Sequence, residues 1–153
     1  MIYTENVKRA MQLAYDAHHG QTDKGGMPYI FHPYAVADGM PDENSVIAAL
    51  LHDVIEDCCE VYADIIRREF SAEIAEAVET LTKRDDLAYD DYIEAVKNNP
   101  IARRVKIADL THNMNLSRID ATEETLTEYQ RERLEKYRHS LQYLLESPQE
   151  DRT

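Results

Sequence analysis

One segment near the middle of the chain, NSVIAALLHDVIEDCCE (residues 44–60), constrains the fold more than any other. Its residues 46–51 are apolar on every side of the helix that they predict, so this helix must be enclosed by neighbouring elements rather than lie on a surface. Strand-like alternation is absent elsewhere, and only four glycines and five prolines occur in 153 residues, which favours helices. We therefore predict an all-α fold of about seven or eight helices.

Apolar periodicity and capping residues divide the rest of the chain into further helices. They are predicted at residues 4–19, from His32-Pro33 onward, and at 43–57, 60–70, 71–82, 87–98, 100–118 and from 122 to near the end. Ser71 and Asn99 are expected as N-caps. The glycine-rich stretch GQTDKGGMPY (20–29) is predicted to be a loop. No linker or repeat interrupts this pattern, so residues 1–153 are predicted to form one domain.

The charge balance restricts the partners that the chain can bind. Acidic residues outnumber basic ones 30 to 17, for a net charge of −13. Affinity for a phosphate backbone needs clustered Lys and Arg, so we expect no nucleic-acid partner. A small phosphorylated substrate would need a metal or a local basic region. The N-terminus has no apolar signal region and no run approaches a membrane span, so we expect a cytoplasmic protein without a membrane partner. Cys58 and Cys59 are adjacent and form no disulfide framework.

The buried segment ends in a group of ionisable residues. Helical spacing places His52 beside Glu56, and Asp53 beside both Glu56 and Asp57. Three carboxylates this close repel one another, and burying an unpaired ion is costly. Alone, such a group is more simply interpreted as the solvated end of a helix. A divalent metal would compensate the charge while using imidazole nitrogen and carboxylate oxygen as ligands.

Two further polar residues occur where apolar residues are expected. His32 lies in PYIFHPYAVA, and Asp109 follows apolar residues in RVKIADLTHNMNL. Each alone would be interpreted as structural. With His52 and Asp53 they make two imidazoles and two carboxylates, a set that suits a divalent ion with positions left for water and substrate. His112, three residues after Asp109, is equally consistent with a structural hydrogen bond and receives no catalytic role.

The order H…HD…D resembles the HD superfamily of metal-dependent phosphohydrolases. The surrounding residues are most similar to the hydrolase domain of RelA/SpoT proteins and to the small stand-alone alarmone hydrolases. The matching stretches are AHHGQ (17–21), PYIFHPYAVA (28–37), AALLHDVIED (48–57), LTK (81–83), VKIADLTHNM (105–114) and RLEKY (133–137). Nothing in the chain resembles the synthetase domain of the bifunctional proteins.

This resemblance implies a single HD-type helical domain that hydrolyses a phosphate ester, usually with Mn²⁺. It implies a catalytic pair, Glu56 and Asp57, and removal of the 3′-pyrophosphate from a guanosine alarmone such as ppGpp. A metal lowers the pKa of bound water, and a nearby carboxylate can accept the proton. The family's metal ligands correspond to His32, His52, Asp53 and Asp109.

The resemblance also suggests substrate contacts. Asn113 matches a residue beside the sugar, Tyr137 an aromatic that stacks on the base, and Lys24 a basic residue of the loop. Lys106 is a further basic candidate because it lies three residues before Asp109. The chain departs from the family's pattern in two regions. In the loop, Asp23 stands where a basic residue is common, and Gly25-Gly26 where a Ser-Gly pair is common. After Asp109, the residues Leu110, Asn115 and Leu116 stand where Arg, Arg and Thr are usual.

These departures remove positive charge from the expected phosphate site, so two alternatives stay open beside ppGpp hydrolysis. One is an HD-type hydrolase of another nucleotide, such as a nucleoside phosphate monoesterase. The other is a nucleotide-binding sensor without turnover, although a pure binder has no need of the Glu56-Asp57 pair. The sequence makes no prediction of the oligomeric state.

Overall fold

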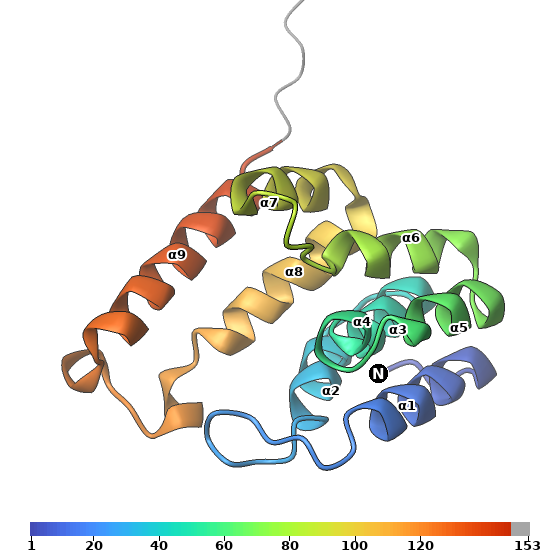
Figure 1. The fold of residues 1–153 in the computed structure, drawn as a ribbon, viewed down its shortest axis with the longest axis horizontal. Coiled ribbons are helices and arrows are strands. Elements are labelled where there is room, and N and C mark those ends of the chain that lie inside the picture. The colour runs from blue at the N-terminus through green and yellow to red at the C-terminus, as the bar shows by residue number, and fades with distance from the viewer. Residues whose placement is uncertain (148–153) are drawn as a thin grey trace, which may run out of the picture.

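The computed structural model describes residues 1–147, and these residues are helical throughout apart from their connections (Figure 1). The helices are α1 (Glu5–Ala17), α2 (Phe31–Asp38), α3 (Glu43–Leu51), α4 (Val54–Asp57), α5 (Val61–Glu69), α6 (Ala72–Leu81), α7 (Tyr89–Asn98), α8 (Pro100–Asn113) and α9 (Glu128–Leu145). Two short 3-10 helices, η1 (Leu116–Ile119) and η2 (Glu123–Thr125), lie between α8 and α9. The predicted all-α class is confirmed. Counting the interrupted pair α3 and α4 as one element gives eight α-helices among the described residues, within the predicted seven or eight.

Helix α3 lies at the centre of the fold and contacts α1, α2, α6 and α8 (Figure 1). Each residue from Ser45 to Leu51 is at most 1% exposed. Six of these seven residues are apolar, and removing them from water on all sides supplies much of the hydrophobic stabilisation around α3. The prediction of an enclosed helix is therefore confirmed, and the residues that follow Leu51 begin inside the protein.

The predicted continuous helix over residues 43–57 is interrupted at His52 and Asp53. Asp42 begins α3 by accepting a hydrogen bond from the Ser45 N–H. At the other end, the Ala49 carbonyl accepts from Nδ1 of His52 at 2.6 Å. In an uninterrupted helix that carbonyl accepts from the N–H of residue 53. The His52 side chain thus offers the carbonyl an alternative partner at the point where the helix breaks.

Two predicted boundaries after residue 99 were wrong. Asn99 and Pro100 start α8 as predicted, but the helix ends at Asn113 rather than Arg118. The Asn115 side chain accepts from the Ser117 N–H and starts η1 instead. The last helix begins after Thr127 rather than Thr122, because Thr127 and Gln130 form its capping box, whereas Thr122 and Thr125 form the capping box that starts η2. Ser71 caps α6 as predicted.

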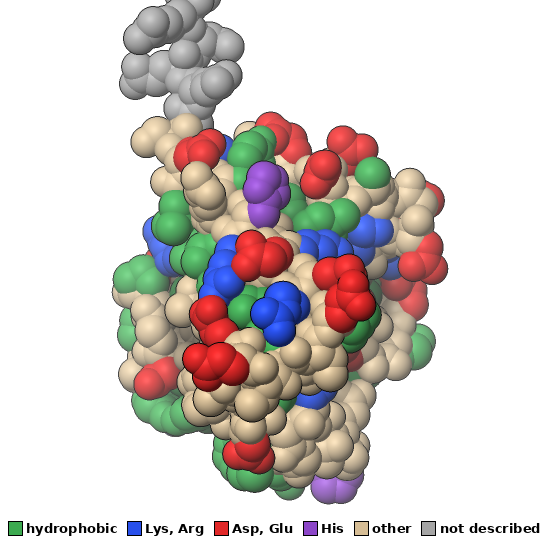
Figure 2. All heavy atoms as spheres, turned by 90° about the vertical axis from the view of Figure 1, so that its left-hand side faces the viewer, with side chains coloured by type: hydrophobic (Ala, Val, Ile, Leu, Met, Phe, Trp, Pro, Cys, Tyr) green, Lys and Arg blue, Asp and Glu red, His purple; other side chains and the backbone are tan. Residues whose placement is uncertain are grey.

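The molecular surface in the direction of α9 carries charges of both signs. Figure 2 shows Asp and Glu side chains interspersed with Lys and Arg on this face, rather than a broad area of either sign. Among the residues that the structure describes, no helix has the length and apolar character that crossing a membrane requires.

Candidate metal centre and adjoining pocket

The four predicted metal ligands come together from three parts of the fold. His32 belongs to α2, Asp109 belongs to α8, and the remaining two occupy the break between α3 and α4. One ligand atom from each of His32, His52 and Asp109 lies within 4.8 Å of the other two. Asp53 joins them, with its Oδ2 2.9 Å from Nε2 of His52 and 3.7 Å from Nε2 of His32. The interrupted helix therefore delivers two adjacent side chains to one point.

The hydrogen bonds of His52 show that this cluster suits a cation. Its Nδ1–H donates to the Ala49 carbonyl, so in the neutral ring Nε2 carries a lone pair. That nitrogen is buried, has no hydrogen-bond partner, and faces the carboxylates of Asp53 and Asp109. Burial lowers the pKa of His52, but the attraction of Asp53 and Asp109 outweighs it and raises the pKa well above its usual range. Positive charge is favoured there, which a divalent ion would supply.

His32 is oriented by a residue for which the sequence predicted no catalytic role. Its Nε2 lies 3.0 Å from Oδ1 of Asp109, and its Nδ1 lies 2.7 Å from Nδ1 of His112. The two rings stack with centroids 5.0 Å apart. Burial, with repulsion from Arg118, lowers the pKa of His112 to about 4, so its ring is neutral at pH 7 and can accept a hydrogen bond. His112 therefore helps direct Nε2 of His32 toward the carboxylates.

Asp109 is held by two donors from its own helix. Lys106 Nζ lies 2.8 Å from its Oδ2, and the Asn113 amide donates to its Oδ1 at 2.8 Å. Burial acts to raise the pKa of Asp109, but Lys106 and the two histidines hold it well below the usual range. Lys106 was predicted to contact substrate, yet it is not among the residues that line the pocket, and its ammonium is paired with Asp109.

Tyr29 was missed by the sequence analysis and contacts the cluster directly. Its hydroxyl donates to Oδ2 of Asp53 at 2.6 Å. Burial and the carboxylates of Asp53, Asp57 and Asp109 raise the pKa of Tyr29 far above its usual range, so it stays a donor. Tyr29 also lines the adjoining pocket, and it therefore forms part of the wall between that pocket and the cluster.

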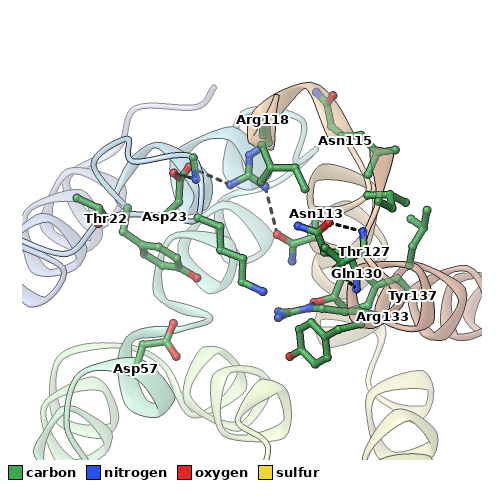
Figure 3. A pocket seen from close by; sticks show the side chains of 18 residues that line it. Thr22, Asp23, Asp57, Asn113, Asn115, Arg118, Thr127, Gln130, Arg133 and Tyr137 are labelled. Atoms are coloured by element: carbon green, nitrogen blue, oxygen red, sulfur yellow. Dashed lines mark hydrogen bonds and ion pairs between the residues drawn. The ribbon is translucent and has the colours of Figure 1, made fainter. Parts of the chain in front are cut away.

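Glu56 and Asp57, the predicted catalytic pair, follow the cluster in α4 and face different surroundings. Oε1 of Glu56 accepts from the Lys83 N–H at 2.8 Å, which fixes its direction toward the end of α6. Asp57 points into the pocket (Figure 3). Burial is the main cause that raises the pKa of both carboxyls, and the charge of Asp53 adds to it. A carboxylate whose pKa is raised toward neutrality is a better proton acceptor.

A pocket of about 610 Å³ adjoins the cluster and contains three of the four predicted substrate contacts, Lys24, Asn113 and Tyr137. Asp57 lies on one side and Arg133 on the other (Figure 3). The sequence analysis missed Arg133, Arg118 and Tyr129, which also line it. The spacing of Tyr129, Arg133 and Tyr137 by four residues along α9 is the signal that could have identified this face.

The aromatic side of the pocket is positively charged. Lys24 Nζ lies 6.0 Å from the Tyr129 ring centroid, and the Arg133 guanidinium lies 5.4 Å from that of Tyr137. Burial and the nearby Arg133 lower the pKa of Lys24. Among the described residues, neither cation forms a salt bridge with a carboxylate. Two cations beside two aromatic rings favour a ligand with an anionic group and a flat ring.

The loop that carries Lys24 is fastened to the segment after α8. Oδ1 of Asp23 accepts from the N–H groups of Gly25 and Met27, and its Oδ2 lies 3.4 Å from Nη2 of Arg118. A Cβ at Gly25 would lie 2.0 Å from the Arg118 carbonyl oxygen. The two backbones approach so closely that only glycine fits. Gly26 has φ +82°, a conformation that also favours glycine.

The sequence matches a model of the HD domain over residues 10–144. It is 39% identical over 127 residues to the bifunctional (p)ppGpp synthase/hydrolase SpoT of Escherichia coli K12, a match that covers 72% of this chain and 18% of that protein. It is 41% identical over 99 residues to a guanosine-3′,5′-bis(diphosphate) 3′-pyrophosphohydrolase of Vibrio cholerae, covering 62% of this chain and 14% of that protein. The chain thus spans less than one fifth of the length of these curated relatives.

The fold is similar to that of a solved structure, a metazoan ortholog of SpoT described as hydrolyzing ppGpp. The two chains superpose with a TM-score of 0.75 at 21% sequence identity, over 96% of this chain and 89% of the other. This likeness shows that the helical arrangement is shared by a chain of comparable length.

Proposed function

The chain belongs to the HD domain family, and on that premise we propose that it is a metal-dependent phosphohydrolase that removes the 3′-pyrophosphate from a guanosine alarmone such as ppGpp. The observation that carries the proposal is one continuous arrangement. Among the described residues, a buried His/Asp cluster with an unpartnered imidazole nitrogen adjoins a pocket that holds two aromatic rings and two cations, Lys24 and Arg133, which form no salt bridge. The similarity to SpoT and to the Vibrio cholerae pyrophosphohydrolase supports the same reaction.

His32, His52, Asp53 and Asp109 would hold a divalent metal, for which we propose Mn²⁺. Their donor set, two imidazole nitrogens and two carboxylates, suits a borderline or hard divalent ion. When bound, such an ion acidifies water and neutralises phosphate charge. Neutralisation matters here because the chain carries a net charge of −13 and would otherwise repel a polyphosphate.

Glu56 and Asp57 would take part in proton transfer and in orienting the substrate. In the proposed reaction water attacks the phosphorus next to the ribose, the bond from that phosphorus to the 3′-oxygen breaks, and pyrophosphate departs. One carboxylate accepts the proton of the attacking water, and a proton returns to the 3′-oxygen to give the hydroxyl. Glu56 is the better candidate for the acceptor, because Lys83 fixes its direction and burial raises its pKa. Asp57, which points into the pocket (Figure 3), would orient the ribose or its hydroxyl.

The remaining pocket residues would bind the rest of the nucleotide. Tyr137 and Tyr129 offer aromatic faces for a base, while Lys24 and Arg133 would pair with the 5′-phosphates. Asn113 borders both the pocket and Asp109, which is suitable for a contact to the sugar. Lys106 would act through Asp109, because its ammonium is paired with that carboxylate.

One observation favours the alternative of a nucleoside phosphate monoester. Arg118 is paired with Asp23, so one of the pocket's cations is already neutralised, which suits a ligand with fewer phosphates. A panel of nucleotides that includes ppGpp, assayed with Mn²⁺ and again with a chelator, separates these functions. The proposal predicts release of pyrophosphate from ppGpp, which the chelator abolishes. Release of inorganic phosphate from monophosphates alone would establish the alternative, and tight binding without turnover of any nucleotide would indicate a sensor.

A further inference from the structure

A continuous series of polar contacts links the Lys24 loop to the metal centre. Asp23 Oδ2 lies 3.4 Å from Nη2 of Arg118, and Nη1 of Arg118 donates to Oδ1 of Asn113 at 3.2 Å. The amide nitrogen of Asn113 donates to Oδ1 of Asp109 at 2.8 Å. Figure 3 shows the first two contacts, with the Arg118 side chain between the loop and Asn113. A single arginine, Arg118, thus joins Asp23 to Asn113, which lie 90 positions apart in sequence.

The chemistry of arginine gives this series a direction. A guanidinium has donors only, so the Asn113 amide must turn its oxygen toward Arg118 and its NH₂ toward Asp109. Without Arg118, the Asp109 carboxylate alone would favour this orientation, because an amide oxygen facing it would be repelled; Arg118 fixes the other end of the amide as well. Arg118 also donates to the His112 carbonyl at 3.2 Å. It is therefore held at the end of α8, beside the residue that it orients.

The Asp109 oxygen at the end of the series faces the metal site. Oδ1 of Asp109 lies 3.0 Å from Nε2 of His32, whereas Oδ2 is paired with Lys106. The Asn113 donor therefore acts on the oxygen nearest the other predicted ligands. A carboxylate held by donors on both oxygens keeps one orientation, which lowers the cost of binding a cation.

At the other end, the guanidinium contacts a loop that has hydrogen bonds of its own. Asp23 is held by its two backbone contacts within the loop, and Gly25 lies against the Arg118 carbonyl. The side chains of Arg118 and Asp23 are only 21% and 13% exposed, so solvent screens their attraction less than it would at an open surface. A shift of the loop would therefore move Arg118.

We propose that Arg118, anchored by Asp23, is a positioning residue that orients Asn113 and through it Asp109, and so couples the substrate loop to metal affinity. The inference rests on the proposed function for the location of the metal. It assigns Arg118 and Asp23 a role that exceeds lining the pocket.

The test is titration of the substrate-free full chain with Mn²⁺ by calorimetry. Arg118→Met, which keeps the length of the side chain without its donors, is expected to weaken Mn²⁺ binding about tenfold, in the range seen when outer-sphere partners of metal ligands are lost. Asp23→Asn keeps the oxygen that the loop amides need but removes the charge, so we expect a smaller loss. In the Arg118→Met background, Asp23→Asn should cause no further loss, because its effect passes through Arg118. Arg138→Met, at a surface arginine of α9, is the matched control and should bind Mn²⁺ as the wild-type chain does.

Wild-type Mn²⁺ affinity in Arg118→Met, or losses that add in the double variant, would overturn the inference. Should Arg118→Met fail to fold, Arg118→Lys keeps the charge near Asp23 but cannot also hold Asn113 with a fork of donors, and it should show the same loss of affinity. A chain that binds Mn²⁺ with these differences but does not cleave ppGpp would overturn the proposed substrate and leave the role of Arg118 standing. A wild-type chain that binds no Mn²⁺ would overturn both.

Discussion

The Nδ1 atoms of His32 and His112 lie 2.7 Å apart, so one ring must donate a hydrogen to the other. Because His112 is neutral at pH 7, it can serve as the acceptor, and His32 then presents the lone pair of Nε2 to the cluster. A histidine that the sequence leaves without a catalytic role thereby sets the state of a proposed ligand.

His112→Ala is expected to weaken Mn²⁺ binding about 10–100-fold, because the outer partner of a metal-binding histidine is lost. Mn²⁺ titration of the purified chain measures this. His112→Gln should retain part of the affinity through its amide oxygen. His139→Ala, at an exposed histidine of α9, is the control. Equal affinities for all four chains would disprove the role of His112.

Asp53→Ala is expected to abolish both metal retention and turnover, because the substitution removes the carboxylate nearest His52. Metal content after dialysis and the initial rate with ppGpp are the two measurements. Asp86→Ala, in the exposed connection before α7, should leave both unchanged. Retention of a full equivalent of metal by Asp53→Ala would remove this residue from the ligand set.

Glu56→Gln should keep the metal but lose most of kcat, since an amide cannot accept the proton. Burial raises the pKa of Glu56, so the wild-type rate should fall with decreasing pH from a higher pH than an ordinary glutamate would give. This acidic limb, seen in a pH–rate profile, should be absent from the residual rate of the variant. Glu60→Gln, at a surface ion pair with Arg84, is the control. Near-full turnover by Glu56→Gln would show that another group accepts the proton.

Gly25→Ala should displace the Lys24 loop, because the new Cβ would lie 2.0 Å from a backbone oxygen that cannot rotate away. We expect a loss of about 1–3 kcal/mol of unfolding free energy, as for other overpacked sites, together with a raised KM. Urea unfolding and steady-state kinetics measure the two effects. Gly39→Ala is a matched control, because a Cβ there meets nothing within 4 Å. Similar behaviour of the two variants would contradict the close approach.

Asp42→Ala removes the N-cap of α3 and should cost about 1 kcal/mol at pH 7. The hydrogen bond from Ser45 and the nearby Arg104 hold the pKa of Asp42 below its usual value, although burial opposes them. A depressed folded-state pKa means that the stabilisation is present above the unfolded-state pKa and lost as the pH falls through the folded one. The difference between wild type and variant in urea unfolding should therefore shrink on acidification. A difference that is constant with pH would assign the effect to something other than the carboxylate.

The sequence predicted the central features of the fold because they depend on local pattern. Six consecutive apolar residues before His52 leave an enclosed helix as the only favourable arrangement, and residues 45–51 of α3 are buried. His32 and Asp109 were identified because each is ionisable within an apolar stretch. The structure places one ligand atom each of His32 and Asp109 within 4.8 Å of one of His52, the residue that follows α3.

The contacts that the sequence did not reveal join distant residues of ordinary type. Asp23 and Arg118 are 95 positions apart, and opposite charges at that separation leave no periodic trace. The end of α8 was misplaced because the side chain of Asn115 competes for the backbone, which helical propensity does not register. Tyr29 was read as part of a loop motif, although its hydroxyl reaches Asp53.

The contact between Gly25 and the Arg118 carbonyl also limits how this domain can exchange parts with its relatives. A loop transplanted from a protein with Ser-Gly at these positions would bring a side chain into the backbone of η1. Such a chimera would have to import residues 113–119 together with residues 20–29. The two segments would therefore have to be exchanged together, despite the seven helices, α2 to α8, and more than 80 residues between them.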